Sequence, residues 1–127
     1  MHGIVRTVSW DVEHTDEFAS GFVDLSETDQ DAIDFTVDLL IAQGPNLRFL
    51  HSSGIGNSQH SHMRERRIQS EGRPLRVVYA FDPRRSAILL IGGDKTGDDR
   101  FYERMIPVAD KLYDVHLKEL KQEGLLK

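Results

Sequence analysis

The chain has 127 residues, a length that fits one domain over residues 1–127, and it contains no cysteine. The absence of cysteine excludes a disulfide framework, thiolate metal sites and a cysteine nucleophile, and it agrees with a reducing compartment. No apolar run approaches the roughly 18 residues of a membrane span, and residues 1–6 lack the apolar core of a signal peptide. We therefore expect a soluble cytoplasmic protein without membrane contact.

The net charge of −5 is distributed unevenly along the sequence. Residues 1–59 carry 2 Lys/Arg against 10 Asp/Glu, residues 60–104 carry 10 against 7, and residues 105–127 carry 4 against 4. Because exposed charges more than about 10 Å apart are largely screened at moderate salt, an acidic chain can still hold a local anion-binding surface. The simpler alternative is a solvated surface of mixed charge.

The first half of the chain predicts one strand and two helices. β-branched residues near Trp10 predict a strand over residues 6–12. Apolar residues at helical spacing follow in residues 18–25, and Ser26 with Asp29 has the pattern of an N-cap that opens a second helix. Gly44 and Pro45 should end that helix, and residues 46–61 predict an irregular connection.

The second half predicts three strands and a long helix. Residues 63–69, 75–81 and 87–91 have strand composition and are separated by turn-forming residues. Helical spacing continues over residues 98–123, where Pro107 should kink or divide the helix. The element order predicts an α+β fold: an N-terminal strand, a helical hairpin, a mostly antiparallel sheet of about four strands, and a C-terminal helix, with the helices on one face of the sheet.

Arginines lie within two of these predicted strands. Arg76 interrupts an apolar run, and residues 64–67 read Arg-Glu-Arg-Arg. A guanidinium group binds phosphate in a planar, bidentate geometry and stays charged at cellular pH, so several on one face form a phosphate site. The first ligand to consider is therefore a polynucleotide backbone.

Three motifs in order carry a family resemblance. They are Met63-Arg64-Glu65-Arg66-Arg67, then Arg76-Val77-Val78-Tyr79-Ala80-Phe81-Asp82-Pro83-Arg84-Arg85, and Gly93-Asp94-Lys95-Thr96. With them, the chain resembles RelE/HigB-type toxins of bacterial type II toxin–antitoxin systems from about Trp10 to Leu120. The resemblance implies a RelE-like fold and an mRNA endonuclease, often acting on the ribosome, that inhibits translation and growth. It also implies a cognate antitoxin, usually a helix-turn-helix protein, through which alone operator DNA would be bound.

One position departs from that family pattern. Arg66 stands where the pattern has an apolar residue. Side chains alternate across a strand, so Arg64, Arg66 and Ile68 should share one face while Glu65 and Arg67 share the other. A buried guanidinium is costly, so Arg66 should extend to solvent, find a carboxylate, or mark an engineered or drifted position.

The implied reaction is attack of a ribose 2′-hydroxyl on the adjacent phosphorus, which requires no metal or other cofactor. Fixed cations would stabilise the developing negative charge. Arg67, Arg76 and Lys95 are the candidates; the resemblance points to Arg76 and Lys95 because they match the family's strand arginine and loop lysine. The alternative for each is a surface salt bridge.

Proton transfer has several candidates. Glu65 is a possible base, or simply an ion-pair partner for Arg67 or Arg76. His51, His60 and His62 are candidate proton shuttles near neutral pH, and the His60-x-His62 pair is also a weak zinc pattern without an evident third ligand. Tyr102 could stack on a base, donate to the leaving oxygen, or lie in the core. Substrate-binding candidates outside the chemistry are Arg64, Arg73, Arg84, Arg85 and His60.

Two other functions remain open from the sequence. ParE-like proteins of the same superfamily poison DNA gyrase instead of cutting RNA, and a fold cannot decide between the two activities. A catalytically silent RNA-binding module is the third possibility. The cluster of cationic candidates favours the nuclease, because a gyrase inhibitor needs no converging phosphate-binding groups.

Overall fold

The computed structural model describes residues 9–47, 52–54, 58–60 and 63–126. Five strands form one sheet in the order β1-β5-β4-β3-β2, in which β1 runs parallel to β5 and the other pairs are antiparallel. The strands are β1 (Val12–His14), β2 (Ser52–Gly54), β3 (Met63–Ser70), β4 (Arg73–Phe81) and β5 (Ala87–Asp94). The helices are α1 (Asp16–Val23), α2 (Glu27–Gln43) and α3 (Phe101–Gln122), with a short 3-10 turn at Gly44–Asn46. The α+β class, the helical hairpin and the C-terminal helix are confirmed.

The helix boundaries follow the expected capping residues. Thr15 caps α1 by accepting the Phe18 amide, and Ser26 caps α2 by accepting the Asp29 amide at 3.2 Å. Gly44 ends α2 with φ at 54°, and a Cβ there would lie 2.4 Å from the Trp10 ring, so only glycine fits this position. The local chemistry of the sequence therefore sets where the hairpin begins and ends.

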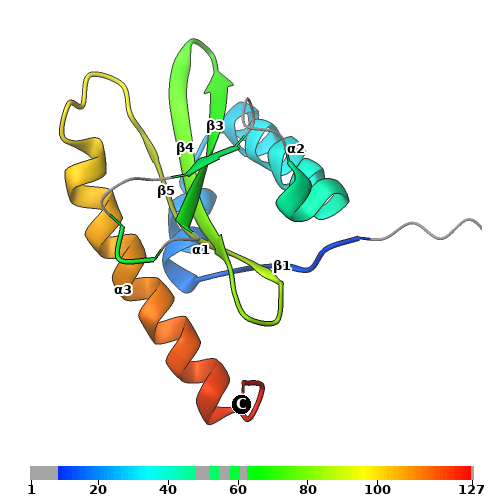
Figure 1. Cartoon of the computed structure of the whole chain (residues 1–127). Coiled ribbons are helices and arrows are strands. Elements are labelled where there is room, and N and C mark those ends of the chain that lie inside the picture. Colours follow the sequence, from blue (N-terminus) through cyan, green and yellow to red (C-terminus); the bar gives the residue numbers. More distant parts are fainter. Residues whose placement is uncertain (1–8, 48–51, 55–57, 61–62, 127) are drawn as a thin grey trace, which may run out of the picture.

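Helices cover both faces of the sheet, which corrects the expectation that they pack on one face. In Figure 1, α1 and α2 lie on one side of the sheet and α3 lies on the other. Strand β4 is buried in both directions: Val77 and Tyr79 belong to the core under α1 and α2, whereas Val78 and Ala80 belong to the core under α3. Side chains that are apolar at successive positions of a strand require both faces of the sheet to be covered. Residues 77–80 of β4 are such a run.

A tight turn sets the pairing of the two arginine-bearing strands. Glu71 and Gly72 both have positive φ, 51° and 75°, as in the two-residue hairpin turns that match strand twist. Ser70 therefore pairs with Arg73, and the ladder continues without a shift to Met63 opposite Ala80. Because a one-residue slip would move every side chain to the opposite face, this turn determines which arginines share a face.

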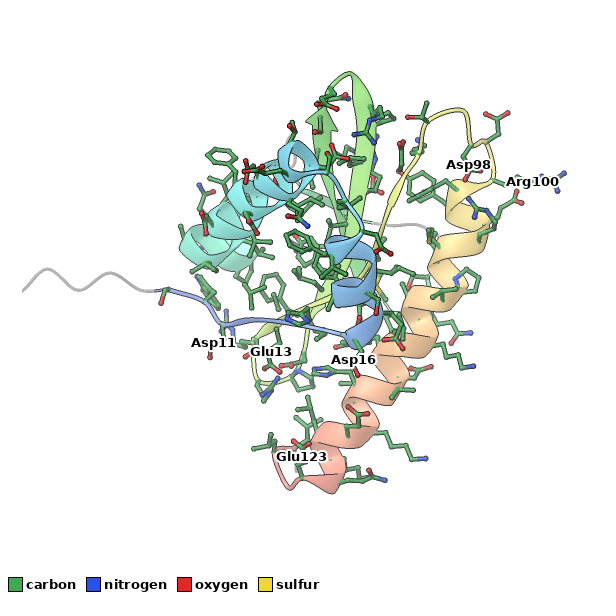
Figure 2. The ribbon with its side chains drawn as sticks, turned by 180° about the vertical axis from the view of Figure 1, so that it is seen from behind. Asp11, Glu13, Asp16, Asp98, Arg100 and Glu123 are labelled. Carbon is green, nitrogen blue, oxygen red and sulfur yellow. The ribbon has the colours of Figure 1, made fainter. Side chains whose placement is uncertain are left out.

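The remaining differences from expectation concern three segments. Strand β2 lies within the segment expected to be an irregular connection, and the described part of the N-terminal strand is Val12–His14 instead of residues 6–12. Helix α3 starts at Phe101 and runs through Pro107 as one helix, so Pro107 does not divide it. Among the described residues, no helix is both long and apolar enough to cross a bilayer. Figure 2 shows α3 from the opposite side, with Glu123 just beyond its end.

Candidate functional site

Arg67 and Arg76 lie directly opposite each other on β3 and β4. Directly paired residues have Cβ atoms about 4.5–5.5 Å apart, and like charges at that spacing repel. Arg67 is 51% exposed, and Arg76 is partly exposed. Two cations held side by side on a sheet face make a site suited to an anion with several oxygens, such as phosphate.

Glu65 joins Arg67 to helix α3. Arg67 Nε donates to Glu65 Oε1 at 3.0 Å, and the Tyr102 hydroxyl donates to the same oxygen at 3.0 Å. Glu65 is only 3% exposed. The carboxylate therefore fixes one arginine and one tyrosine relative to each other, as the ion-pair alternative for Glu65 predicted.

Lys95 reaches this group from the loop after β5. Its Nζ lies 4.8 Å from the centroid of the Tyr102 ring, within the range of a cation–π contact. Gly93 permits this arrangement, because a Cβ there would lie 2.9 Å from the Phe101 ring and would push α3 away from the sheet. Side-chain contacts thus connect Glu65, Arg67, Lys95 and Tyr102, and Arg76 lies next to them through its pairing with Arg67. We call these five of the six predicted catalytic residues the cationic cluster.

Arg76 is held by its own strand. Its Nη1 donates to the Leu75 carbonyl at 2.9 Å, while its Nε is buried and has no hydrogen-bond partner in the part of the chain that the structure describes. No carboxylate among the described residues forms an ion pair with Arg76, so the charge of its partly exposed guanidinium is available to a bound anion. This observation separates Arg76 from an ordinary surface salt bridge.

Of the three candidate histidines, the structure describes His60 alone. His62, the sixth predicted catalytic residue, and His51 lie outside the described residues. His60 Nε2 contacts Asp114 Oδ1 at 2.7 Å, and its ring packs edge-on against Tyr113. His60 is therefore a neighbour of α3 with a carboxylate partner, and its RNA-binding role stays a prediction.

Two arginines of β3 point to the opposite face, as the alternation predicted. Arg64 Nη1 reaches the Pro45 carbonyl at 3.5 Å, on the side of α2. Arg66 is 2% exposed, so the alternative in which it extends to solvent is wrong, and burial lowers the pKa of its guanidinium. Neither side chain lies in the cationic cluster, so an RNA contact from Arg64 would have to lie on the other face.

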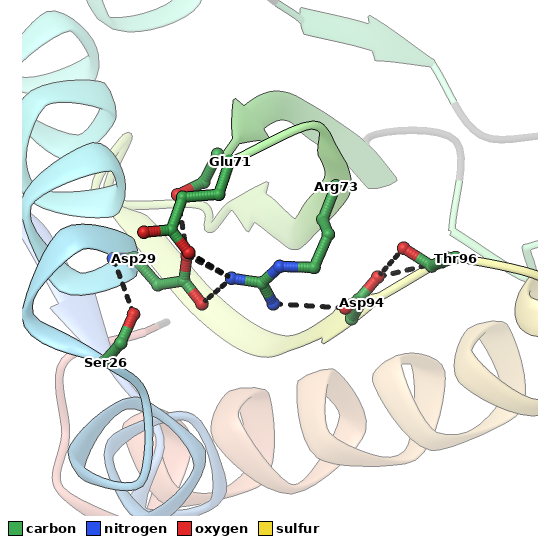
Figure 3. Close-up of polar contacts among 7 residues, drawn as sticks. Ser26, Asp29, Glu71, Arg73, Asp94 and Thr96 are labelled. Carbon is green, nitrogen blue, oxygen red and sulfur yellow. Dashed lines mark hydrogen bonds and ion pairs between the residues drawn. The ribbon is translucent and has the colours of Figure 1, made fainter.

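Arg73 belongs to a polar network at the hairpin end of the sheet (Figure 3). Its Nη2 donates to both oxygens of Asp29, at 2.6 and 2.5 Å, and its Nη1 donates to Asp94 at 3.2 Å. Hydrogen bonds from Arg73 and then Ser70 hold the pKa of the Asp29 carboxyl below its ordinary value. These contacts occupy the guanidinium that the sequence offered to RNA, and they tie α2 to the strand end that precedes Lys95.

Arg84 and Arg85 have different surroundings although they are neighbours. Arg84 Nη2 donates to Asp82 at 2.7 Å and to Glu13 at 2.6 Å, so its charge is compensated within the protein. His116 Nε2 also contacts the buried Asp82 at 3.0 Å, an interaction between the turn after β4 and helix α3 that the sequence did not reveal. Arg85 is exposed and lies over the Trp10 ring, 5.5 Å from its centroid. Of the two, only Arg85 presents its charge to solvent.

Comparison with known proteins gives the family of this chain. Residues 20–114 match the family model described as "Phage derived protein Gp49-like (DUF891)". The chain belongs to the Gp49-like family. Two similar proteins come from Mycobacterium tuberculosis: "Putative toxin HigB3", 41% identical over 76 residues, and "Putative toxin HigB2", 31% identical over 119 residues. These alignments cover 59% and 91% of this chain.

The resemblance to HigB-type toxins is confirmed by this family and by both relatives. The matched parts make up 65% and 58% of the two relatives, so the chain spans less than two thirds of the length of either protein. The match to the family begins within α1 and ends within α3, and it contains all five residues of the cationic cluster.

Proposed function

We propose that this protein is the toxin of a type II toxin–antitoxin system and that it acts as an endoribonuclease on mRNA, in association with the ribosome. The observation that carries the proposal is the pairing of Arg67 with Arg76 beside Lys95 and Tyr102. An RNA backbone offers the phosphate that such a group binds, and the reaction needs added positive charge at the scissile phosphate as the phosphorane forms. A cytoplasmic location fits this substrate.

In the proposed reaction, the ribose 2′-oxygen forms a bond to the adjacent phosphorus while the bond from phosphorus to the 5′-oxygen breaks. The products are a 2′,3′-cyclic phosphate and a free 5′-hydroxyl. Arg67 and Arg76 stabilise the charge on the non-bridging oxygens, and Lys95 adds a third cation beside Tyr102. The Tyr102 hydroxyl is the proposed proton donor to the leaving 5′-oxygen.

Glu65 is proposed to orient the other groups. It is 3% exposed, and its Oε1 already accepts from Arg67 and Tyr102. A general base must lie within hydrogen-bond reach of the proton that it takes. A buried carboxylate cannot readily reach the 2′-hydroxyl of a bound RNA. The proton of the 2′-hydroxyl is therefore assigned to a histidine, with His60 and His62 as the candidates.

The proposed partner is an antitoxin, and a helix-turn-helix protein would supply any contact with operator DNA. We propose that the antitoxin covers the cationic cluster or changes the position of α3, because α3 contributes Tyr102 to the cluster. Carboxylates on the antitoxin would match the charge of Arg67 and Lys95.

Purified protein added to translating ribosomes with a defined mRNA tests the proposal. We expect discrete cuts whose downstream fragments carry 5′-hydroxyl ends, together with unchanged supercoiling by DNA gyrase in a parallel reaction. Inhibition of gyrase without cleavage would contradict the proposal and favour the ParE-like alternative. Binding of mRNA without cleavage would favour a silent RNA-binding module.

A further inference from the structure

A cavity of about 490 Å³ opens beside the cationic cluster and is assigned no role by the proposed reaction. Tyr102 belongs to both, since its hydroxyl contacts Glu65 and its ring lines the cavity. The floor is one stripe of α3, with residues three or four positions apart that share a helix face. The cavity is lined by Gln59, Tyr102, Glu103, Ile106, Pro107, Asp110, Lys111 and Asp114.

The wall opposite α3 is fixed by two carboxylates of the helix. Asp110 is buried and accepts from Ser58 Oγ at 2.5 Å and from the Gln59 amide at 3.0 Å. Asp114 contacts His60 Nε2 at 2.7 Å. The side chain of Gln59 is thereby carried on a segment that is anchored on both sides.

The lining combines an apolar surface with hydrogen-bond acceptors. Tyr102, Ile106 and Pro107 offer a surface on which a planar ring can lie, and Glu103 is an exposed carboxylate at its edge. The Glu103 carboxylate is therefore the acceptor that this lining residue offers to a ligand.

The charges exclude a second phosphate as the preferred ligand. Glu103, Asp110 and Asp114 outnumber Lys111 among the lining residues, so a phosphate there would be repelled. A neutral planar group with N–H donors can instead stack on the apolar residues and donate hydrogen bonds to the carboxylates. Carboxylates accept hydrogen bonds from the exocyclic amino groups of nucleobases, and adenine, cytosine and guanine carry such a group whereas uracil does not.

We propose that this cavity binds the base of the nucleotide next to the phosphate held by the cationic cluster, and that it prefers bases with an exocyclic amino group over uracil. The inference rests on the proposed function, since it takes RNA as the substrate. Glu103 and Gln59 are the residues that set the preference: Glu103 accepts from the amino group, and the amide of Gln59 can donate to a ring nitrogen or carbonyl oxygen. The volume lies within the usual range for small-molecule sites.

Binding of 2′-deoxy dinucleotides tests the inference apart from cleavage, because they lack the attacking hydroxyl. Adenine, cytosine and uracil dinucleotides would be titrated into isotope-labelled protein, with NMR shifts followed at the Gln59 side-chain amide and the Glu103 backbone amide. We expect the adenine and cytosine dinucleotides to bind at least about fivefold more tightly than the uracil dinucleotide. Glu103→Gln should abolish that difference, whereas Glu119→Gln, the same change elsewhere on α3, should keep it.

Equal affinity for the three dinucleotides, a preference that survives Glu103→Gln, or shifts that do not involve Gln59 and Glu103 would each overturn the assignment. None of these results touches the proposed cleavage, which the ribosome assay decides separately. If the cavity shows the expected base preference but the ribosome assay shows no cleavage, the proposed nuclease activity is wrong and the base-binding site remains supported.

Discussion

Arg67 and Arg76 face each other across β3 and β4 on the side of the sheet that α3 covers only in part. The pairing brings two permanent charges together, and it is maintained by the Glu71-Gly72 turn that sets the register of the hairpin. The Glu65 carboxylate compensates the charge of Arg67, whereas no carboxylate among the described residues forms an ion pair with Arg76. We interpret this relationship as the basis of a site for the scissile phosphate.

The hydroxyl of Tyr102 can be tested apart from its ring. Tyr102→Phe retains the ring under Lys95 but loses the donor to Glu65 and to the leaving oxygen. We expect cleavage to fall by about 10²-fold or more, the usual scale for general acid catalysis, with RNA affinity nearly unchanged. Tyr113→Phe is the matched control, because the Tyr113 hydroxyl contacts the Phe81 carbonyl in the core. Equal cleavage by Tyr102→Phe and wild type would exclude the hydroxyl from the reaction.

Arg84 and Arg85 should separate stability from RNA binding. Arg84→Ala removes a partner of the buried Asp82 and should lower the free energy of unfolding by about 1–3 kcal/mol. Arg85→Ala should change stability by less than about 0.5 kcal/mol, as for other exposed positions, and should weaken RNA binding more at low salt than at high salt. Denaturant unfolding and salt-dependent binding measure both. A larger loss of stability in Arg85→Ala, together with a larger loss of RNA affinity in Arg84→Ala, would contradict the ion-pair geometry.

Asp29 should make folding stability depend on pH in the acid range. Because hydrogen bonds lower the pKa of its carboxyl in the folded state, Asp29 stabilises the protein above the unfolded-state pKa of about 3.9, and the contribution is lost as pH falls through the lower folded-state value. Asp29→Asn should therefore lower the melting temperature at pH 7, and the difference from wild type should shrink below about pH 4. Asp31→Asn, an exposed change on the same helix, should show neither effect. If the difference in melting temperature between wild type and Asp29→Asn stayed the same from pH 7 to below about pH 4, the pKa of Asp29 would not contribute to stability in this way.

Arg66 tests the cost of a buried guanidinium. Replacing a buried charged group with an apolar one of similar size is often neutral or stabilising by about 1–4 kcal/mol. We expect Arg66→Met, which has the apolar type of the family pattern and a side chain of more similar length, to keep or raise the free energy of unfolding. Chemical denaturation provides the measurement. A loss of more than about 1 kcal/mol would mean that the Arg66 interactions stabilise the fold beyond their desolvation cost.

The cationic cluster could be predicted from sequence because it depends on local rules. Strand alternation assigned Glu65 and Arg67 to one face, and a turn-forming segment implied that β3 and β4 are adjacent. The family motifs then added Lys95, and Tyr102 was a candidate because it follows Lys95 shortly in the sequence. Short-range periodicity and the motifs thus contained most of the information about this cluster.

Contacts between distant residues were not predictable in the same way. Arg73 pairs with Asp29 across 44 positions and Arg84 pairs with Glu13 across 71, so nothing near either arginine indicated that its charge was already compensated. The arrangement of helices on both faces had a readable signal, the continuous apolar run from Val77 to Ala80, which the sequence interpretation assigned to one buried face. Nothing in the sequence near Asp110 indicated that it accepts hydrogen bonds from Ser58 and Gln59.

Single-turnover cleavage of saturating ribosome-bound mRNA shows whether Arg76 and Lys95 act in the transition state, when Arg76→Ala and Lys95→Ala are compared with wild type. Groups that act in the transition state lower the rate even when substrate is fully bound, whereas groups that only hold the substrate raise the concentration required. We predict that Arg76→Ala cleaves about 10²- to 10³-fold more slowly at saturation, with Lys118→Ala on the far half of α3 unaffected. Wild-type cleavage by saturated Arg76→Ala would exclude a transition-state role for Arg76 and leave the paired arginines as a substrate-holding site.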